Sequence, residues 1–179
     1  KAADGQLCAQ CHADFMKETA GGVNHSPFSS GMCLSCHDVH GSNVKGMAAK
    51  PLGELCGACH TEVPKDVSGA RSRHQPVASS ECTQCHNPHK SRLQGLLLAR
   101  TPELCVTCHK DLKARMEKER PHQPAVRNCD RCHKPHASAQ PSLLAQAIQP
   151  MCLECHSPAR PGFAKAHVNI DAMVMDCRK

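Results

Sequence analysis

The chain has 179 residues, with 22 lysine and arginine residues against 16 aspartate and glutamate residues, 15 cysteines and 14 histidines. It contains no tryptophan, no tyrosine and three phenylalanines, so the large side chains that usually fill a hydrophobic core are scarce. The lack of aromatic stacking platforms argues against nucleic-acid binding. No apolar stretch approaches the length of a transmembrane helix, so we expect no membrane-spanning segment.

Helix signals along the chain are few and strand signals are poorer still. Three helices are predicted, over residues 4–18, from residue 53 to a point before Pro64, and from an N-cap at Thr101 to a point before Pro121. Thirteen prolines interrupt the remaining sequence. Short apolar segments at 96–99 and 143–148 are read as linkers. The predicted fold class is mostly irregular with a few short α-helices and little or no β-sheet.

The motif CxxCH occurs seven times and uses fourteen of the fifteen cysteines. Two thiols at this spacing bind the vinyl groups of haem covalently, and the adjoining histidine becomes an axial ligand of the iron. Structural zinc and a disulfide scaffold are the alternatives, but neither explains a histidine after every cysteine pair. The motif predicts seven covalent haem c groups, bound by Cys8, Cys11, Cys33, Cys36, Cys56, Cys59, Cys82, Cys85, Cys105, Cys108, Cys129, Cys132, Cys152 and Cys155.

The histidines divide equally between the motifs and the rest of the chain. The seven predicted proximal ligands are His12, His37, His60, His86, His109, His133 and His156. The seven others are His25, His40, His74, His89, His122, His136 and His167. This equality predicts seven six-coordinate irons, each with two histidine ligands. The haems would then replace the missing core and give an elongated, haem-cored molecule.

The motifs form a repeat of 47 to 49 residues. Type 1 sites have an apolar residue before the first cysteine and begin at Cys8, Cys56, Cys105 and Cys152. Type 2 sites begin at Cys33, Cys82 and Cys129 and carry a second histidine three residues after the first, the coupling histidine (His40, His89, His136). An HxP histidine (His25, His74, His122) lies between them. The chain is therefore predicted to be one unit of about three and a half two-haem modules, approximately 1–49, 50–98, 99–145 and 146–179.

The coupling histidines cannot serve the haem of their own motif. A histidine three residues beyond a proximal ligand lies on the same side of the haem, so His89 should serve a different iron from His86. The economical assignment gives coupling histidines to type 1 haems, of their own or the following module, and HxP histidines to the type 2 haems after them. His167 would then serve the haem of His156, or that of His12 in a head-to-tail neighbour.

The alternation of LCxxCH, HxP and CxxCHxPH over about residues 7–156 resembles the doubled-CxxCH multihaem c-type cytochrome family. That family includes the pentahaem electron donor of periplasmic nitrite reductase and the decahaem cytochromes of outer-membrane conduits. The resemblance implies an electron carrier whose bis-histidine haems form a wire. Val39 replaces the usual proline of one xPH motif.

Electron transfer is the function that these observations favour, with redox proteins as donors and acceptors. The alternative is a subunit of an extracellular cytochrome filament or porin conduit, and thus a possible homo-oligomer. A multihaem redox enzyme is less favoured, since the chain has no CxxCK motif and no tyrosine. Haem attachment outside the cytoplasm predicts a periplasmic or extracellular protein after removal of an export signal. Cys177, outside every motif, is expected to be an unpaired thiol, and the alternative is a disulfide between two chains.

Overall fold

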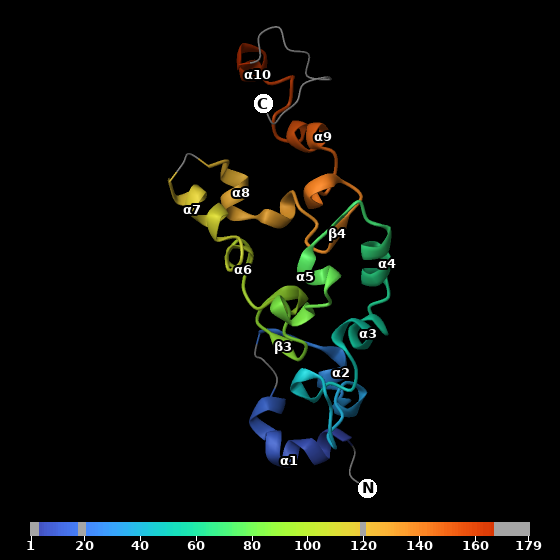
Figure 1. Ribbon diagram of the computed structural model, residues 1–179. Helices are drawn as coiled ribbons and strands as arrows, with labels where there is room; N and C mark the ends of the chain where they lie inside the picture. Colours follow the sequence, from blue (N-terminus) through green and yellow to red (C-terminus); the bar gives the residue numbers. More distant parts are fainter. Residues whose placement is uncertain (1–3, 18–20, 119–120, 167–179) are drawn as a thin grey trace.

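The computed structural model describes residues 4–17, 21–118 and 121–166. Within these ranges the chain forms ten short α-helices, six 3-10 turns and four two-residue strands. Figure 1 shows an elongated molecule in which α1 lies at one end and α9 and α10 at the other, so the sequence advances along the long axis. The predicted fold class, mostly irregular with short helices and little sheet, is confirmed.

The type 1 motifs begin in helices. The first cysteine of each lies in α1 (Asp4–Met16), α3 (Leu52–Gly57), α6 (Glu103–Val106) or α9 (Ile148–Leu153). The motif histidine interrupts the helical path, as His12 does within α1 at φ −107° and ψ 32°. The helices that follow are α4 (Glu62–Gly69), α7 (Lys110–Lys118) and α10 (Pro161–Ala166).

Two of the three predicted helices need correction. The helix at 4–18 is confirmed and ends at Met16. The single helix predicted after Thr101 is wrong, because α6 stops at Val106 and α7 begins only at Lys110. The predicted stop before Pro64 is also wrong, because α4 contains Pro64 as its third residue. Proline is tolerated there, since amides of the first turn have no acceptor within the helix.

The HxP signature marks a helix start that the sequence analysis did not recognise. Each HxP histidine is extended and is the N-cap of a short helix with proline at its start. These helices are α2 (Ser26–Ser29), α5 (Gln75–Ala78) and α8 (Gln123–Arg127).

The type 2 motifs lie in 3-10 turns that are closed by a second turn downstream. The first cysteine of each motif lies in η1 (Cys33–Ser35), η3 (Cys82–Gln84) or η5 (Cys129–Arg131), and the second cysteine is the C-cap. The closing turns are η2 (Lys45–Met47), η4 (Gln94–Leu96) and η6 (Pro141–Leu143). In the first module the amide of Ala49 donates to the carbonyl of Cys36 at 2.9 Å, and the other two modules repeat this bond. The type 2 motif is thus held in a closed loop.

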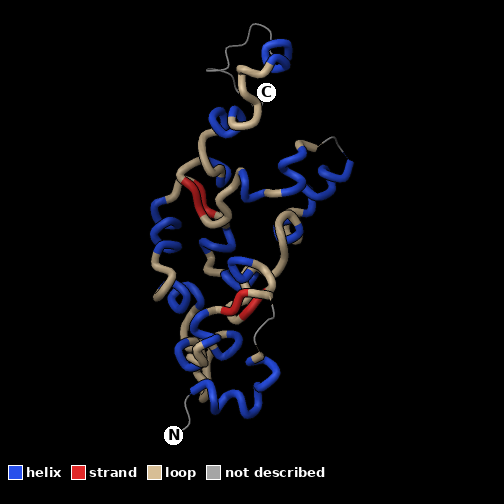
Figure 2. Tube along the Cα trace, turned by 180° about the vertical axis from the view of Figure 1, so that it is seen from behind, coloured by secondary structure: helices blue, strands red, loops and turns tan. Residues whose placement is uncertain are grey.

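Strand pairing connects one module to the next. Strand β1 (Val23–Asn24) pairs antiparallel with β3 (Lys90–Ser91), and β2 (Ser72–Arg73) with β4 (Ala137–Ser138). Figure 2 shows these two ladders at separate heights along the molecule. Each ladder joins the residues before an HxP histidine to those after the coupling histidine of the following module. Adjacent modules therefore interlock, and the module boundaries stay a prediction.

Side-chain packing alone builds very little core. Among the described residues only Ala48, Ala137, Leu144 and Ser138 are buried. Large apolar side chains remain open, including Leu7, which is 61% exposed, and Leu34, which is 53% exposed. No helix in the described part of the chain is long and apolar enough to cross a membrane.

Candidate functional site

Among the described residues, imidazole rings from distant parts of the chain face each other in five places. The ring centres of each pair lie 5.9 to 6.1 Å apart. In every pair one member is a CxxCH histidine and the other is an HxP or coupling histidine. The pairs are His25 with His60, His37 with His89, His74 with His109, His86 with His136, and His122 with His156.

The separation fits one metal ion between two rings. A metal–nitrogen bond of about 2 Å on each side, plus about 1 Å from each nitrogen to its ring centre, spans about 6 Å. The two facing imidazoles of each pair would bind the iron of a haem, and the adjoining cysteines would hold that haem covalently. The donor set and its spacing therefore fit a bis-histidine c-type haem.

The five pairs follow a single rule across module boundaries. A coupling histidine faces the type 2 histidine of the preceding module, as His89 faces His37. An HxP histidine faces the type 1 histidine of the following module, as His25 faces His60. Every pair therefore joins two modules.

The pairing expected from the sequence is wrong in its partners. His89 was expected opposite a type 1 histidine, and the HxP histidines opposite the type 2 histidines that follow them. The physical reason is the ladder between modules, in which the amide of His25 donates to the carbonyl of His89 at 2.8 Å. The sequence-based assignment gave coupling histidines to type 1 haems of their own or the following module, and it did not include pairing with the preceding module. The narrower expectation that His89 does not serve the iron of His86 agrees with the structure.

A backbone carbonyl orients each type 2 histidine. The Nδ1 atom of His37 lies 3.0 Å from the carbonyl oxygen of Gly46, that of His86 2.7 Å from Gly95, and that of His133 3.0 Å from Ser142. All three carbonyls belong to residues with positive φ in the closing turns. The ring donates through Nδ1–H and leaves Nε2 as the metal-binding nitrogen, the usual outer-shell arrangement of ligating histidines.

The coupling histidines are half-buried where they face a partner. Burial, followed by the neighbouring His37 and His25 and the Lys90 ammonium, lowers the pKa of the His89 imidazole below its ordinary value. Burial and His86 and His74 lower the pKa of His136 in the same way, against a smaller opposing effect of Asp66. A lowered pKa favours the neutral imidazole, which is the form that binds a metal.

The haem-attachment cysteines of neighbouring sites lie next to each other. The Cys56 thiol lies close enough to the Cys82 thiol, and the Cys105 thiol to the Cys129 thiol, for each neighbour to raise its pKa, after the larger effect of burial. Burial, and then the adjacent Cys82, raise the pKa of the Cys56 thiol to about 11. The type 1 and type 2 sites of one module therefore meet at their first cysteines.

Contacts also continue from one module into the next. Cys36 lies close enough to Cys56, and Cys85 to Cys108, to raise the thiol pKa of Cys56 and of Cys85 electrostatically, in each case after the larger effect of burial. Farther along, the Arg131 side chain lies 3.7 Å from the Cys155 sulfur. The attachment sites thus adjoin one another in chain order from Cys33 to Cys155.

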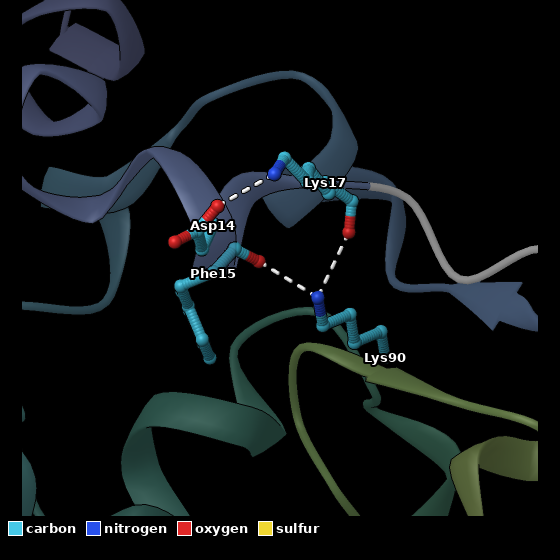
Figure 3. Close-up of polar contacts among 4 residues, drawn as sticks. All are labelled: Asp14, Phe15, Lys17 and Lys90. Atoms are coloured by element: carbon cyan, nitrogen blue, oxygen red, sulfur yellow. Dashed lines mark hydrogen bonds and ion pairs between the residues drawn. The ribbon is translucent and has the colours of Figure 1, made fainter.

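A lysine joins the coupling segment to the first helix. The Nζ atom of Lys90 donates to the carbonyl oxygens of Phe15 and Lys17, both at 2.8 Å, as Figure 3 shows. These carbonyls lie at the C-terminal end of α1, where backbone acceptors lack helical partners and a positive charge is favoured. The exposed Asp14–Lys17 ion pair beside them, at 2.6 Å, contributes little.

Four predicted ligands are not in a facing pair of described residues. His12 lies at the kink of α1, and His133 has its Nδ1 contact to Ser142 but no described imidazole opposite. His40 is exposed, and its amide donates to the Asp38 side chain at 3.1 Å. His167, like Cys177, lies outside the described residues.

Three groups that shape the sites were not predicted from the sequence. These are the positive-φ turns, Lys90, and the phenylalanines around His89. Two glycines at corresponding positions, Gly46 and Gly95, were a signal for the turns. Nothing in the sequence pattern marked Lys90.

Comparisons with known proteins agree with the geometry. A family model described as the doubled CXXCH motif matches residues 25–65, 74–114 and 122–161, which together are more than half of the chain. No curated protein matched the chain. Each matched segment runs from an HxP histidine to beyond the next type 1 motif, so it includes one type 2 and one type 1 site.

Proposed function

The chain belongs to the doubled CXXCH motif family and is a multihaem c-type cytochrome, and from this premise we propose that it carries electrons along seven bis-histidine haems. The observation that carries the proposal is the unbroken series of adjoining attachment sites from Cys33 to Cys155. Covalent haem supplies reversible one-electron iron chemistry. The chain's own contribution is to hold the sites in order, with each one next to its neighbour.

The number of seven haems rests on the sequence motifs. The three family-model matches include six CxxCH motifs and leave out the one at Cys8, Cys11 and His12. That motif has the same spacing and an apolar residue before it, Leu7, and it begins in a helix as the other type 1 motifs do. We therefore count it as the first haem site.

A carrier fits the ligand set better than an enzyme does. Catalysis at a haem needs an iron with an open face, whereas five motif histidines already face a second imidazole. Two histidine ligands also give a lower potential than a histidine and methionine pair. The proposed partners are redox proteins, and the proposed location is periplasmic or extracellular because c-type haem is attached there.

Three measurements on the chain, produced in a host that attaches c-type haem, test this proposal. Mass spectrometry is expected to find seven covalent haems. Electron paramagnetic resonance of the oxidised protein is expected to show low-spin iron at all five described pairs. A redox titration is expected to show reversible uptake of one electron per haem. High-spin iron at a described pair, together with turnover of a small substrate, would overturn the carrier and favour an enzyme.

A second candidate function, a subunit of an extended cytochrome assembly, is favoured by His40. This coupling histidine is exposed, whereas His89 and His136 are half-buried against type 2 partners. His40 has no imidazole opposite it among the described residues, and the type 2 histidine His133 has none either. Because the pairing rule joins a coupling histidine to a type 2 histidine, His40 of one copy would face His133 of a second copy.

Assembly is tested by comparing the haem protein with its His40→Ala variant at rising concentration. Light scattering and electron microscopy are expected to show end-to-end association of the parent protein and none of the variant. Lys45→Ala, a change at another exposed residue of the same loop, is the matched control. Association that survives His40→Ala would contradict this role for the histidine.

A further inference from the structure

Two of the three phenylalanines pack against a single histidine. The ring centre of Phe15 lies 4.9 Å from that of His89 with the planes at 77°, and that of Phe28 lies 5.4 Å away at 69°. The phenylalanines also contact each other at 5.4 Å and 73°. All three contacts are edge-to-face, the arrangement that aromatic rings prefer. His89 is therefore held between two rings that support each other.

Two hydrogen bonds also hold the backbone of His89 in place. Its carbonyl oxygen accepts from the amide of His25 at 2.8 Å, and its amide donates to the side chain of Asn87 at 3.0 Å. The next residue, Lys90, binds the end of the helix that carries Phe15. Phe15 and Phe28 thus form an aromatic cage around His89. The cage joins α1 and α2 to residues 89–90 of the second module.

Such a cage determines a property that bonding to a metal leaves free. The last side-chain torsion of histidine is broad, and a metal–nitrogen bond permits rotation of the ring about its own axis. Packing therefore sets the plane of the ring. The planes of His89 and His37 are 7° apart, whereas those of His136 and His86 are 50° apart.

The repeat provides an internal comparison for the cage. The type 2 site of the second module pairs His86 with His136. In the sequence repeat, Val63 occupies the position of Phe15, and Val77 occupies that of Phe28. Ala137 takes the place of Lys90. The site with aromatic neighbours has parallel imidazoles, and the site with aliphatic residues at these positions has inclined ones.

We propose that Phe15 and Phe28 are positioning residues that hold the His89 plane parallel to His37 and so distinguish this iron site electronically from that of His86. The proposal rests on the proposed function, since it concerns the haems that these histidines would bind. Parallel imidazoles donate into the same iron d orbital and split the two relevant d levels, which gives a rhombic low-spin resonance. Inclined imidazoles leave these levels closer in energy, which increases the largest g value and raises the potential.

The test is paramagnetic resonance of the oxidised holoprotein with matched variants. The double variant Phe15→Leu with Phe28→Leu keeps apolar volume but removes the flat ring edges. One haem equivalent of rhombic signal is expected to move to a larger g value, with the number of low-spin haems unchanged and one midpoint potential raised. Phe15→Tyr retains the ring and is expected to retain the spectrum. Leu112→Ala, at the position of Phe15 in the third module, is the control and is expected to leave the spectrum unchanged.

A second double variant introduces the two rings at the His86 site, and it tests the same role if the first double variant loses a haem. Val63→Phe with Val77→Phe is expected to convert one haem equivalent at the His86 site toward the rhombic signal. Wild-type spectra from both double variants would overturn the positioning role while leaving electron transfer intact. A parent protein without low-spin haem or electron uptake would instead overturn the proposed function.

Discussion

The backbone amide of His25 donates a 2.8 Å hydrogen bond to the carbonyl of His89, although the two imidazoles face different partners. His25 faces His60 and His89 faces His37. One backbone bond thus ties together two candidate iron sites. His74 and His136 repeat it at 3.1 Å in the next pair of modules.

Replacing His89 with alanine is expected to open the iron site of His37 and to leave that of His60 closed, because His60 has His25 as its own partner. One haem equivalent of high-spin signal should appear in the oxidised protein. Removing the attachment cysteines Cys33 and Cys36 in the same variant should abolish that signal. If instead the signal disappears on removing the cysteines of the His60 site, the observed pairing does not hold in solution.

Replacing Ser142 with glycine is expected to stabilise the holoprotein by about 0.5–1 kcal/mol. Ser142 has φ 56°, in the left-handed region, where the corresponding residues of the other modules are Gly46 and Gly95. The reciprocal variant Gly95→Ser should lose about 1 kcal/mol, since its φ is 67°. Guanidinium unfolding of both variants measures the change. Destabilisation by Ser142→Gly would show that the serine side chain contributes more than the backbone strain costs.

Replacing Gly5 with alanine is expected to separate α1 from the loop before the Cys33 motif. A Cβ at Gly5 would lie 2.7 Å from the Cα of Gly31, which is backbone and cannot rotate away. We expect a loss of about 1–3 kcal/mol, typical of overpacking. Gly69→Ala is the matched control, because a Cβ there meets nothing within 4 Å. Equal unfolding midpoints for the two variants would contradict the close approach.

Preventing haem attachment is expected to abolish cooperative unfolding of the chain. Only four described residues are buried, so the protein part alone cannot offset the entropy of ordering the chain. Calorimetry and circular dichroism of the chain made without the attachment machinery should show no sharp transition. The holoprotein from the same gene is the control. A cooperative transition in the haem-free chain would disprove a cofactor-built core.

The sequence predicted what depends on local spacing and failed where distant segments meet. The CxxCH pairs, the two kinds of site and the scarcity of sheet follow from composition and motif order. The helix over 4–18 was predicted from its cap and its terminating glycines. Pairing of His89 with His37 depends on a two-residue ladder, and pairs of that length have no recognisable hydrophobic alternation.

Side-chain contacts that depend on an unusual backbone conformation could not be predicted from the sequence either. The carbonyl of Gly46 can bind His37 only because the closing turn takes positive φ, and the third module reaches the same shape with Ser142. The helix start at an HxP histidine was legible in principle, since proline favours the first turn.

The interlocking of modules sets the order in which a growing chain can be completed. Because a chain is synthesised from its N-terminus, His25 is made before the motif of His60, so in this pair the second ligand is present before the haem-attachment motif. For the pair of His37 and His89 the order is reversed. A haem attached at the His37 motif would have only one histidine ligand until His89 has been made. Along the chain, a pair whose second ligand is made first therefore alternates with a pair whose haem motif is made first. Each new module supplies the missing histidine of the type 2 site in the module before it.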